Sequence, residues 1–110
     1  MENIPYQKRT QKQLQDALKK ILNLLCMRDW EIELVVGTTQ PKELSAEWNC
    51  SASVSYNVAM LKAVLFVNPL LCAERNEDPL WNLYHEVFHI WLNYQEDEER
   101  QCNILASLIM

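Results

Sequence analysis

The segment that begins at Pro79 constrains the fold most, because it predicts a helix that is apolar around most of its circumference. Asp78 and Pro79 form a strong helix start, since an aspartate accepts hydrogen bonds from the first N–H groups and proline needs no such bond at the first helical position. We expect this helix to run to about Asn93 and to be buried. Its apolar face comprises Leu80, Leu83, Tyr84, Val87, Ile90, Trp91 and Tyr94, with Phe88 at the edge.

The remaining sector of this helix carries His85, Glu86 and His89, which read H-E-x-x-H and include both histidines of the chain. Two imidazoles four residues apart project to the same side of a helix and can bind one metal ion. The glutamate after the first histidine occupies the position of the general base in zinc peptidases. We therefore expect His85 and His89 to bind Zn²⁺ and Glu86 to be catalytic. The alternative is that two surface histidines flank a glutamate by chance.

A third zinc ligand is expected, because catalytic zinc usually takes three protein ligands and leaves one position open. The acidic run of residues 96–99 precedes a predicted last helix, Glu96 to Ile109, that folds back antiparallel to the first. Glu99 is the favoured ligand, because it belongs to a stripe of small and polar residues that can pack close to the metal. Glu98 is the alternative, and a solvated helix start is another. The stripe consists of Glu99, Cys102, Asn103 and Ala106.

The chain upstream of the motif predicts one amphipathic helix and three short strands. Residues 6–28 have apolar positions at helical spacing, which is typical of a helix that covers a sheet. Alternating or branched residues then predict strands at 30–36, 50–56 and 62–67, the last two as an antiparallel hairpin that turns near residues 57–60. Asn68 and Pro69 stop the third strand, and residues 70–77 form a connector. The segment 38–49 is expected to be a loop with one helical turn.

These elements predict a single α+β domain over residues 1–110. A small three-stranded sheet packs on an amino-terminal helix, on the H-E-x-x-H helix and on a carboxyl-terminal helix that carries the glutamates. A chain of 110 residues, with 49% hydrophobic content, can bury one real core.

The formal net charge of -5 argues against non-specific binding to nucleic acid or to an anionic membrane, because both need an excess of Lys and Arg. The sequence shows no apolar signal-peptide core and no stretch long enough to span a bilayer, so we expect a cytoplasmic protein. Its cysteines stand singly, without a C-x-x-C pair, and reduced, mostly buried thiols are the expectation. They are Cys26, Cys50, Cys72 and Cys102.

The two motif helices together resemble the ImmA/IrrE family of small zinc metallopeptidases. Residues 85–89 match its H-E-x-x-H, residues 99–106 match its E-x-x-[AC]-N-x-[FL]-A helix, and the strands leading to 67–69 are similar at the level of pattern. The chain is also similar to the minimal glutamate-zincins, or minigluzincins. This resemblance implies that His85, His89 and Glu99 bind zinc, that Glu86 is general base and acid, and that Asn103 supports the site. Family members that cut repressors imply a protein substrate.

The function expected from the sequence is zinc-dependent hydrolysis of peptide bonds in a protein substrate such as a regulatory repressor. The alternative is a latent or inactive metal-binding domain that acts as a protein-interaction module. Tyr56 and Tyr94 are candidates for the group that stabilises the oxyanion, although a tyrosine at either position is more often a wall residue.

Overall fold

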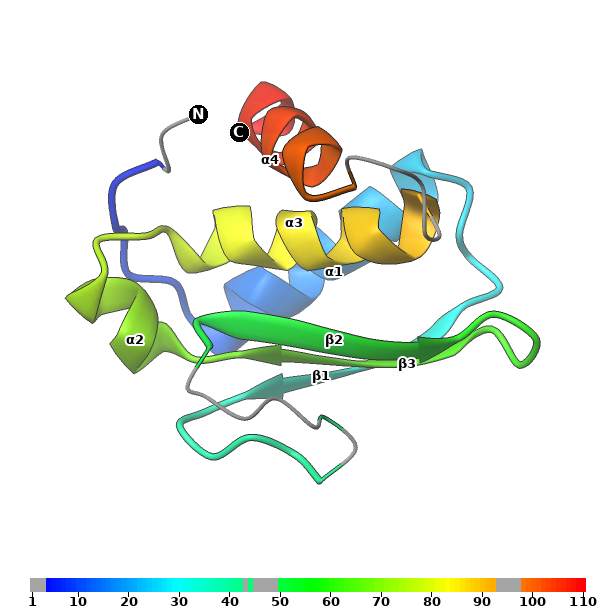
Figure 1. Ribbon diagram of the computed structural model, residues 1–110, viewed down its shortest axis with the longest axis horizontal. Coiled ribbons are helices and arrows are strands. Elements are labelled where there is room, and N and C mark those ends of the chain that lie inside the picture. The colour runs from blue at the N-terminus through cyan, green and yellow to red at the C-terminus, as the bar shows by residue number, and fades with distance from the viewer. Residues whose placement is uncertain (1–3, 43, 45–49, 93–97) are drawn as a thin grey trace.

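The computed structural model describes residues 4–42, 44, 50–92 and 98–110, and in the last range it describes side chains from residue 101 onward. These residues form an α+β fold with a small mixed sheet (Figure 1), which confirms the predicted fold class. In chain order the elements are α1 (Gln11–Leu24), β1 (Glu31–Val36), β2 (Ala52–Asn57), β3 (Lys62–Val67), α2 (Pro69–Glu74), α3 (Pro79–Leu92) and α4 (Glu98–Ile109).

The sheet has the strand order β1-β3-β2, so the last strand in sequence lies in the middle. The predicted hairpin is confirmed, because β2 pairs antiparallel with β3 from Ala52 opposite Val67 to Asn57 opposite Lys62. The parallel pairing of β1 with β3 was not expected from the sequence. As a result, β2 is an edge strand of the described sheet, and α3 packs against it more extensively than against β3.

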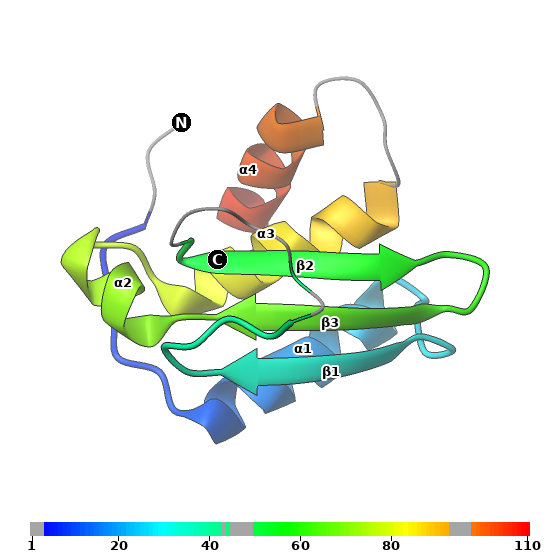
Figure 2. The same cartoon turned by 60° about the horizontal axis from the view of Figure 1, so that its bottom comes forward.

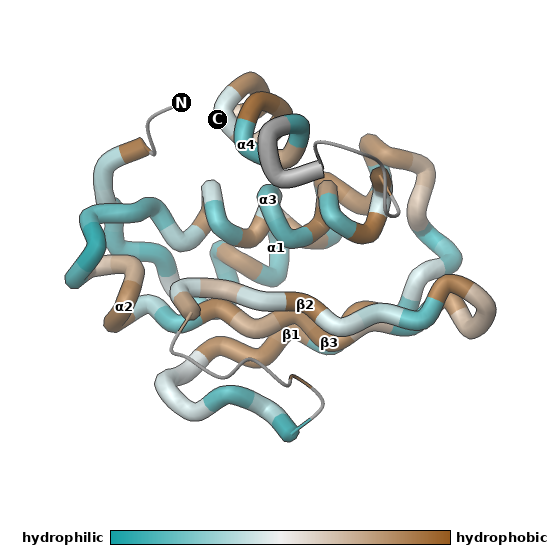
Figure 3. The backbone as a smooth tube through the Cα atoms, in the orientation of Figure 1, coloured by the Kyte–Doolittle hydropathy of each residue, from teal (hydrophilic) through white to brown (hydrophobic). Residues whose placement is uncertain are grey.

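Helices α1 and α3 cover the same face of the sheet, as Figure 1 shows. Thr10 caps α1, since its hydroxyl accepts from the Gln13 N–H while the Gln13 side chain accepts from the Thr10 N–H. Figure 3 shows that β3 is hydrophobic along most of its length. The core between the sheet and the two helices contains Leu14, Leu18 and Ile21 of α1, Ala63, Leu65 and Val67 of β3, and Leu83, Val87 and Ile90 of α3.

The start of α3 is anchored by the amino-terminal segment. Helix α3 begins at Pro79, as predicted, and the Asp78 carboxylate accepts from the Leu80 N–H at 2.9 Å. The same carboxylate, which is fully buried, forms two hydrogen bonds with the Arg9 guanidinium, at 3.1 and 2.7 Å. The Asp78 N–H donates to the Ile4 carbonyl at 3.1 Å. Two contacts that are remote in sequence therefore hold the first turn of α3.

Helix α4 doubles back over α3 on the side away from the sheet (Figures 1 and 2). It starts near the end of α3 and runs obliquely back across it, which agrees with the predicted antiparallel sense. Cys102 and Ala106 are fully buried, so these two members of the predicted stripe of small and polar residues pack inward, and Asn103 is half-buried. Near the other end of the pair, the Trp81 indole N–H donates to the Ser107 hydroxyl at 3.1 Å.

The predicted apolar face of α3 is wrong at one position, because Trp91 is 45% exposed. The sheet, α1 and α4 cover the other sides of the helix. Leu92, the next residue, is buried instead of Trp91. Trp91 packs edge-on against the Phe88 ring at a centroid distance of 5.9 Å. The last residues of this predicted helix, Asn93 and Tyr94, lie outside the described residues, as does most of the helical turn expected near Glu43 to Trp48.

The thiols differ in exposure: Cys72 and Cys102 are buried, Cys50 is half-buried and Cys26 is exposed. The expectation of mostly buried thiols therefore fails at Cys26, which follows the end of α1. None of the helices in the described part of the chain has the length and apolar character needed to cross a bilayer.

Candidate metal centre

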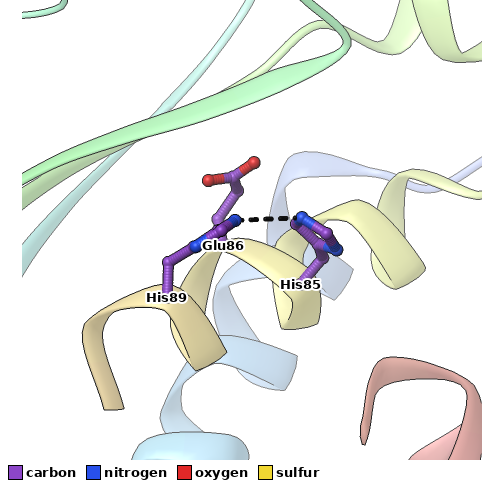
Figure 4. A group of neighbouring side chains, drawn as sticks. All are labelled: His85, Glu86 and His89. Carbon is purple, nitrogen blue, oxygen red and sulfur yellow. Dashed lines mark hydrogen bonds between the residues drawn. The ribbon is translucent and has the colours of Figure 1, made fainter. Parts of the chain in front are cut away.

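The side chains of His85, Glu86 and His89 leave the same side of α3 (Figure 4). Residues one and four positions after His85 lie about 100° and 40° around a helix from it, so the three share one sector. The Nε2 atoms of His85 and His89 are 3.1 Å apart. Including a Glu86 carboxylate oxygen, the possible ligand atoms lie within 4.8 Å of one another. The structure thus brings together the three motif residues predicted from the sequence.

The separation of the two imidazole nitrogens matches what a tetrahedral zinc ion requires. Two nitrogens bound at about 2.0–2.1 Å with a tetrahedral angle between them lie about 3.3 Å apart. The observed 3.1 Å is close to this value and is also compatible with one N–H···N hydrogen bond between neutral rings. The donor set therefore fits a zinc ion without rearrangement of α3. Within the described residues, this is the one group of three His, Cys, Asp or Glu side chains close enough to hold a metal ion.

The two histidines differ in their surroundings. His85 is buried, with 8% of its surface exposed, and its ring stacks on the Trp81 ring at a centroid distance of 5.2 Å. His89 and Glu86 are half-buried. Among the described residues, the His85 side of the site is therefore more enclosed than the side of Glu86 and His89.

The third ligand stays a prediction, because the side chains of Glu98 and Glu99 lie outside the described residues. Their backbone forms the first turn of α4, at the end nearer to the carboxyl end of α3 (Figure 2). Asn103 is half-buried on α4, next to the fully buried Cys102. Its supporting role also stays a prediction.

Of the two tyrosines that are candidates for stabilising the oxyanion, the structure describes Tyr56 but not Tyr94. Tyr56 is half-buried on β2 and packs against the hydrophobic core, which agrees with the interpretation as a wall residue. Tyr94 lies outside the described residues.

Trp81 is the residue near the site that sequence reasoning missed. It is buried, its ring stacks on the His85 ring, and its indole N–H donates a hydrogen bond to Ser107 of α4. The spacing carried a signal for it, because Trp81, His85 and His89 recur every four residues and hence share one side of the helix.

Cys72 lies near α3 but is not a candidate ligand or nucleophile. The Asn82 side-chain amide donates to its sulfur at 3.3 Å, and the thiol is fully buried. Burial raises the pKa of Cys72 from 9.0 to about 11. Since the thiolate is the form that binds metal or attacks an electrophile, this thiol is inert at neutral pH.

Comparisons with protein-family models, with curated proteins and with solved structures give no match for this chain. The case for function consequently depends on the site itself. The geometry supports a candidate metal-binding site of the H-E-x-x-H type at His85, Glu86 and His89.

Proposed function

We propose that this protein is a zinc-dependent metallopeptidase of the kind its motif helices resemble, the ImmA/IrrE family and the minimal glutamate-zincins. The observation that carries the proposal is the 3.1 Å separation of the His85 and His89 Nε2 atoms, with the Glu86 carboxylate on the same side of the helix. Zinc would supply a Lewis acid that polarises a carbonyl oxygen and activates water at neutral pH.

His85 and His89 would hold the ion through Nε2, and Glu99 would complete the set, with Glu98 as the alternative. The direction of α4 supports this choice. Trp81, near the start of α3, bonds to Ser107 in the last turn of α4, so the first turn of α4 lies towards the His89 end of α3. Glu98 and Glu99 therefore belong to the turn of α4 that begins near the carboxyl end of α3, which supports their choice as candidate ligands.

Glu86 would act as general base and then as general acid. Glu86 is half-buried, so part of the residue is exposed to solvent. In hydrolysis it would take a proton from the attacking water and deliver it to the leaving amine. This role needs a carboxylate close to both imidazoles, which the 4.8 Å limit on the three ligand atoms provides.

The edge strand β2 would hold the substrate. It packs against α3, and its second edge has no neighbouring strand in the described sheet. An extended peptide can add to such an edge through main-chain hydrogen bonds, next to the motif helix. A protein substrate with an accessible extended segment would fit this arrangement, and the resemblance to proteins that cut repressors supports a repressor as the substrate.

The alternative function is a metal-binding interaction module without catalysis. It is favoured by the burial of His85, because structural metal sites are closed to solvent. A library of peptides incubated with zinc-loaded protein, and with its Glu86→Gln variant at the same zinc content, separates the two. Cleavage that depends on Glu86 supports the peptidase, whereas zinc binding without cleavage by the parent protein supports the module.

A further inference from the structure

The indole ring of Trp81 covers one face of the His85 imidazole. Trp81 lies one helical turn before His85 on α3 and is 4% exposed. The two rings stack at a centroid distance of 5.2 Å and an interplanar angle of 30°. The terminal torsion of a histidine is broad, so a helix alone does not fix the direction of Nε2. The contact with Trp81 restricts that torsion.

The same indole ring also contacts α4 through its polar edge. Its N–H donates to the Ser107 hydroxyl at 3.1 Å, across 26 residues of sequence. Ser107 is half-buried and follows Ala106, whose side chain is fully buried. One side chain thus connects a motif histidine with the helix that carries the predicted third ligand.

We propose that Trp81 is a positioning residue that couples the docking of α4 to the orientation of the His85 ring, and so raises the affinity of the site for zinc. The inference depends on the proposed function for its metal, but the contacts themselves are independent of it. Residues that orient a metal-binding histidine typically change metal affinity by roughly 10–100-fold when they are replaced. Because coupling between sites is reciprocal, zinc bound at His85 would in turn stabilise the docked position of α4.

Four variants separate the contributions. Trp81→Leu removes the stack and the hydrogen bond, Trp81→Phe keeps an aromatic ring but removes the N–H, and Ser107→Ala removes the acceptor alone. Trp91→Phe is the matched control, because Trp91 is on the same helix and 45% exposed. The measurements are zinc affinity by competition with a chelator and the visible spectrum of the cobalt-substituted protein, which reports ligand geometry.

We expect Trp81→Leu to lower zinc affinity by roughly 10–100-fold and to alter the cobalt spectrum. Trp81→Phe and Ser107→Ala should each cause a smaller loss of zinc affinity. A variant that combines these two changes should lose no more affinity than the weaker-binding single variant, since both changes remove the same hydrogen bond. Trp91→Phe should match the parent. Folded Trp81→Phe, Ser107→Ala and Trp81→Leu proteins with the parent affinity and spectrum would overturn the inference. If Trp81→Leu does not fold, the other two variants decide.

A parent protein that binds no zinc would refute the proposed function, and with it the proposed effect of Trp81 on the zinc affinity of the site. The positioning role would then be decided on the metal-free protein by side-chain NMR. The aromatic protons of His85 should be shifted upfield by the indole ring in the parent and should return towards free-histidine positions in Trp81→Leu. Equal His85 shifts in both proteins would overturn the positioning role as well.

Discussion

The Nε2 atoms of His85 and His89 face each other at 3.1 Å on one side of α3. Helical periodicity alone puts two histidines with this spacing on the same side, but it does not make their rings converge. Convergence is what a shared ligand requires. It is supported here by the Trp81 ring, which stacks on the His85 ring.

Replacement of Glu99 by Ala should lower zinc affinity by more than the roughly 10–100-fold expected for loss of an outer partner, because it would remove a direct ligand. Asn103→Ala should fall within that 10–100-fold range, as expected for a supporting residue. Glu98→Ala is the matched control and should bind zinc like the parent. Chelator competition measures all three. A large loss in Glu98→Ala with none in Glu99→Ala would exchange the two assignments.

Replacement of Arg9 by Met should lower the free energy of unfolding by about 3–5 kcal/mol, because it would leave the buried Asp78 carboxylate without its counter-ion. The hydrogen bond to Asp78 raises the pKa of Arg9, so the guanidinium keeps its charge at neutral pH. Lys8→Met, at an exposed neighbouring position, should change stability by less than about 0.5 kcal/mol. Urea unfolding measures both. Equal stability of the two variants would mean that the ion pair does not anchor α3.

Cys72 should make the protein less stable in alkaline solution. Its folded pKa is raised from 9.0 to about 11, so above pH 9 the unfolded chain loses a proton that the folded protein retains. Stability should be unaffected below about pH 8 and should fall by up to roughly 2–3 kcal/mol as the pH rises towards 11. Urea unfolding at several pH values should show this slope in the parent.

Two variants check the origin of that slope. Cys72→Ala should reduce the loss of stability between pH 9 and 11, whereas Cys26→Ala, at an exposed thiol, should retain it. An unchanged slope in Cys72→Ala would assign the effect to other groups. At pH 8, iodoacetamide should alkylate Cys26 much faster than Cys72, which mass spectrometry of the digested protein can measure.

The parts of the fold that the sequence predicts correctly are those with local signals. Asp78 followed by Pro79 predicts the start of α3, because capping and the proline ring act within one turn. Asn68 followed by Pro69 ends β3, and the structure adds that Asn68 caps α2 by accepting from the Leu71 N–H. The pairing of β2 with β3 follows from their closeness in the chain.

The features that the sequence does not reveal depend on contacts between distant residues. The parallel pairing of β1 with β3 and the contact of Arg9 with Asp78 have no signature in either partner alone. Periodicity predicts Trp91 on the buried face because it gives the apolar side of a helix but not how far the neighbouring elements extend along it. The motif residues were predictable from their spacing, whereas the hydrogen bond of Trp81 to Ser107 required the packing of α4.

The most direct test is a zinc titration of the metal-free protein that is monitored by calorimetry and by NMR of the two histidine rings. If the His85 and His89 nitrogens at 3.1 Å form a metal site, one zinc ion should bind per chain and the Nε2 resonances of both rings should shift together. His89→Ala should abolish zinc binding, and His89→Gln should bind little zinc. Failure of the parent protein to bind zinc, with the nitrogen resonances of both rings unchanged, would contradict the assignment of His85 and His89 as a metal centre.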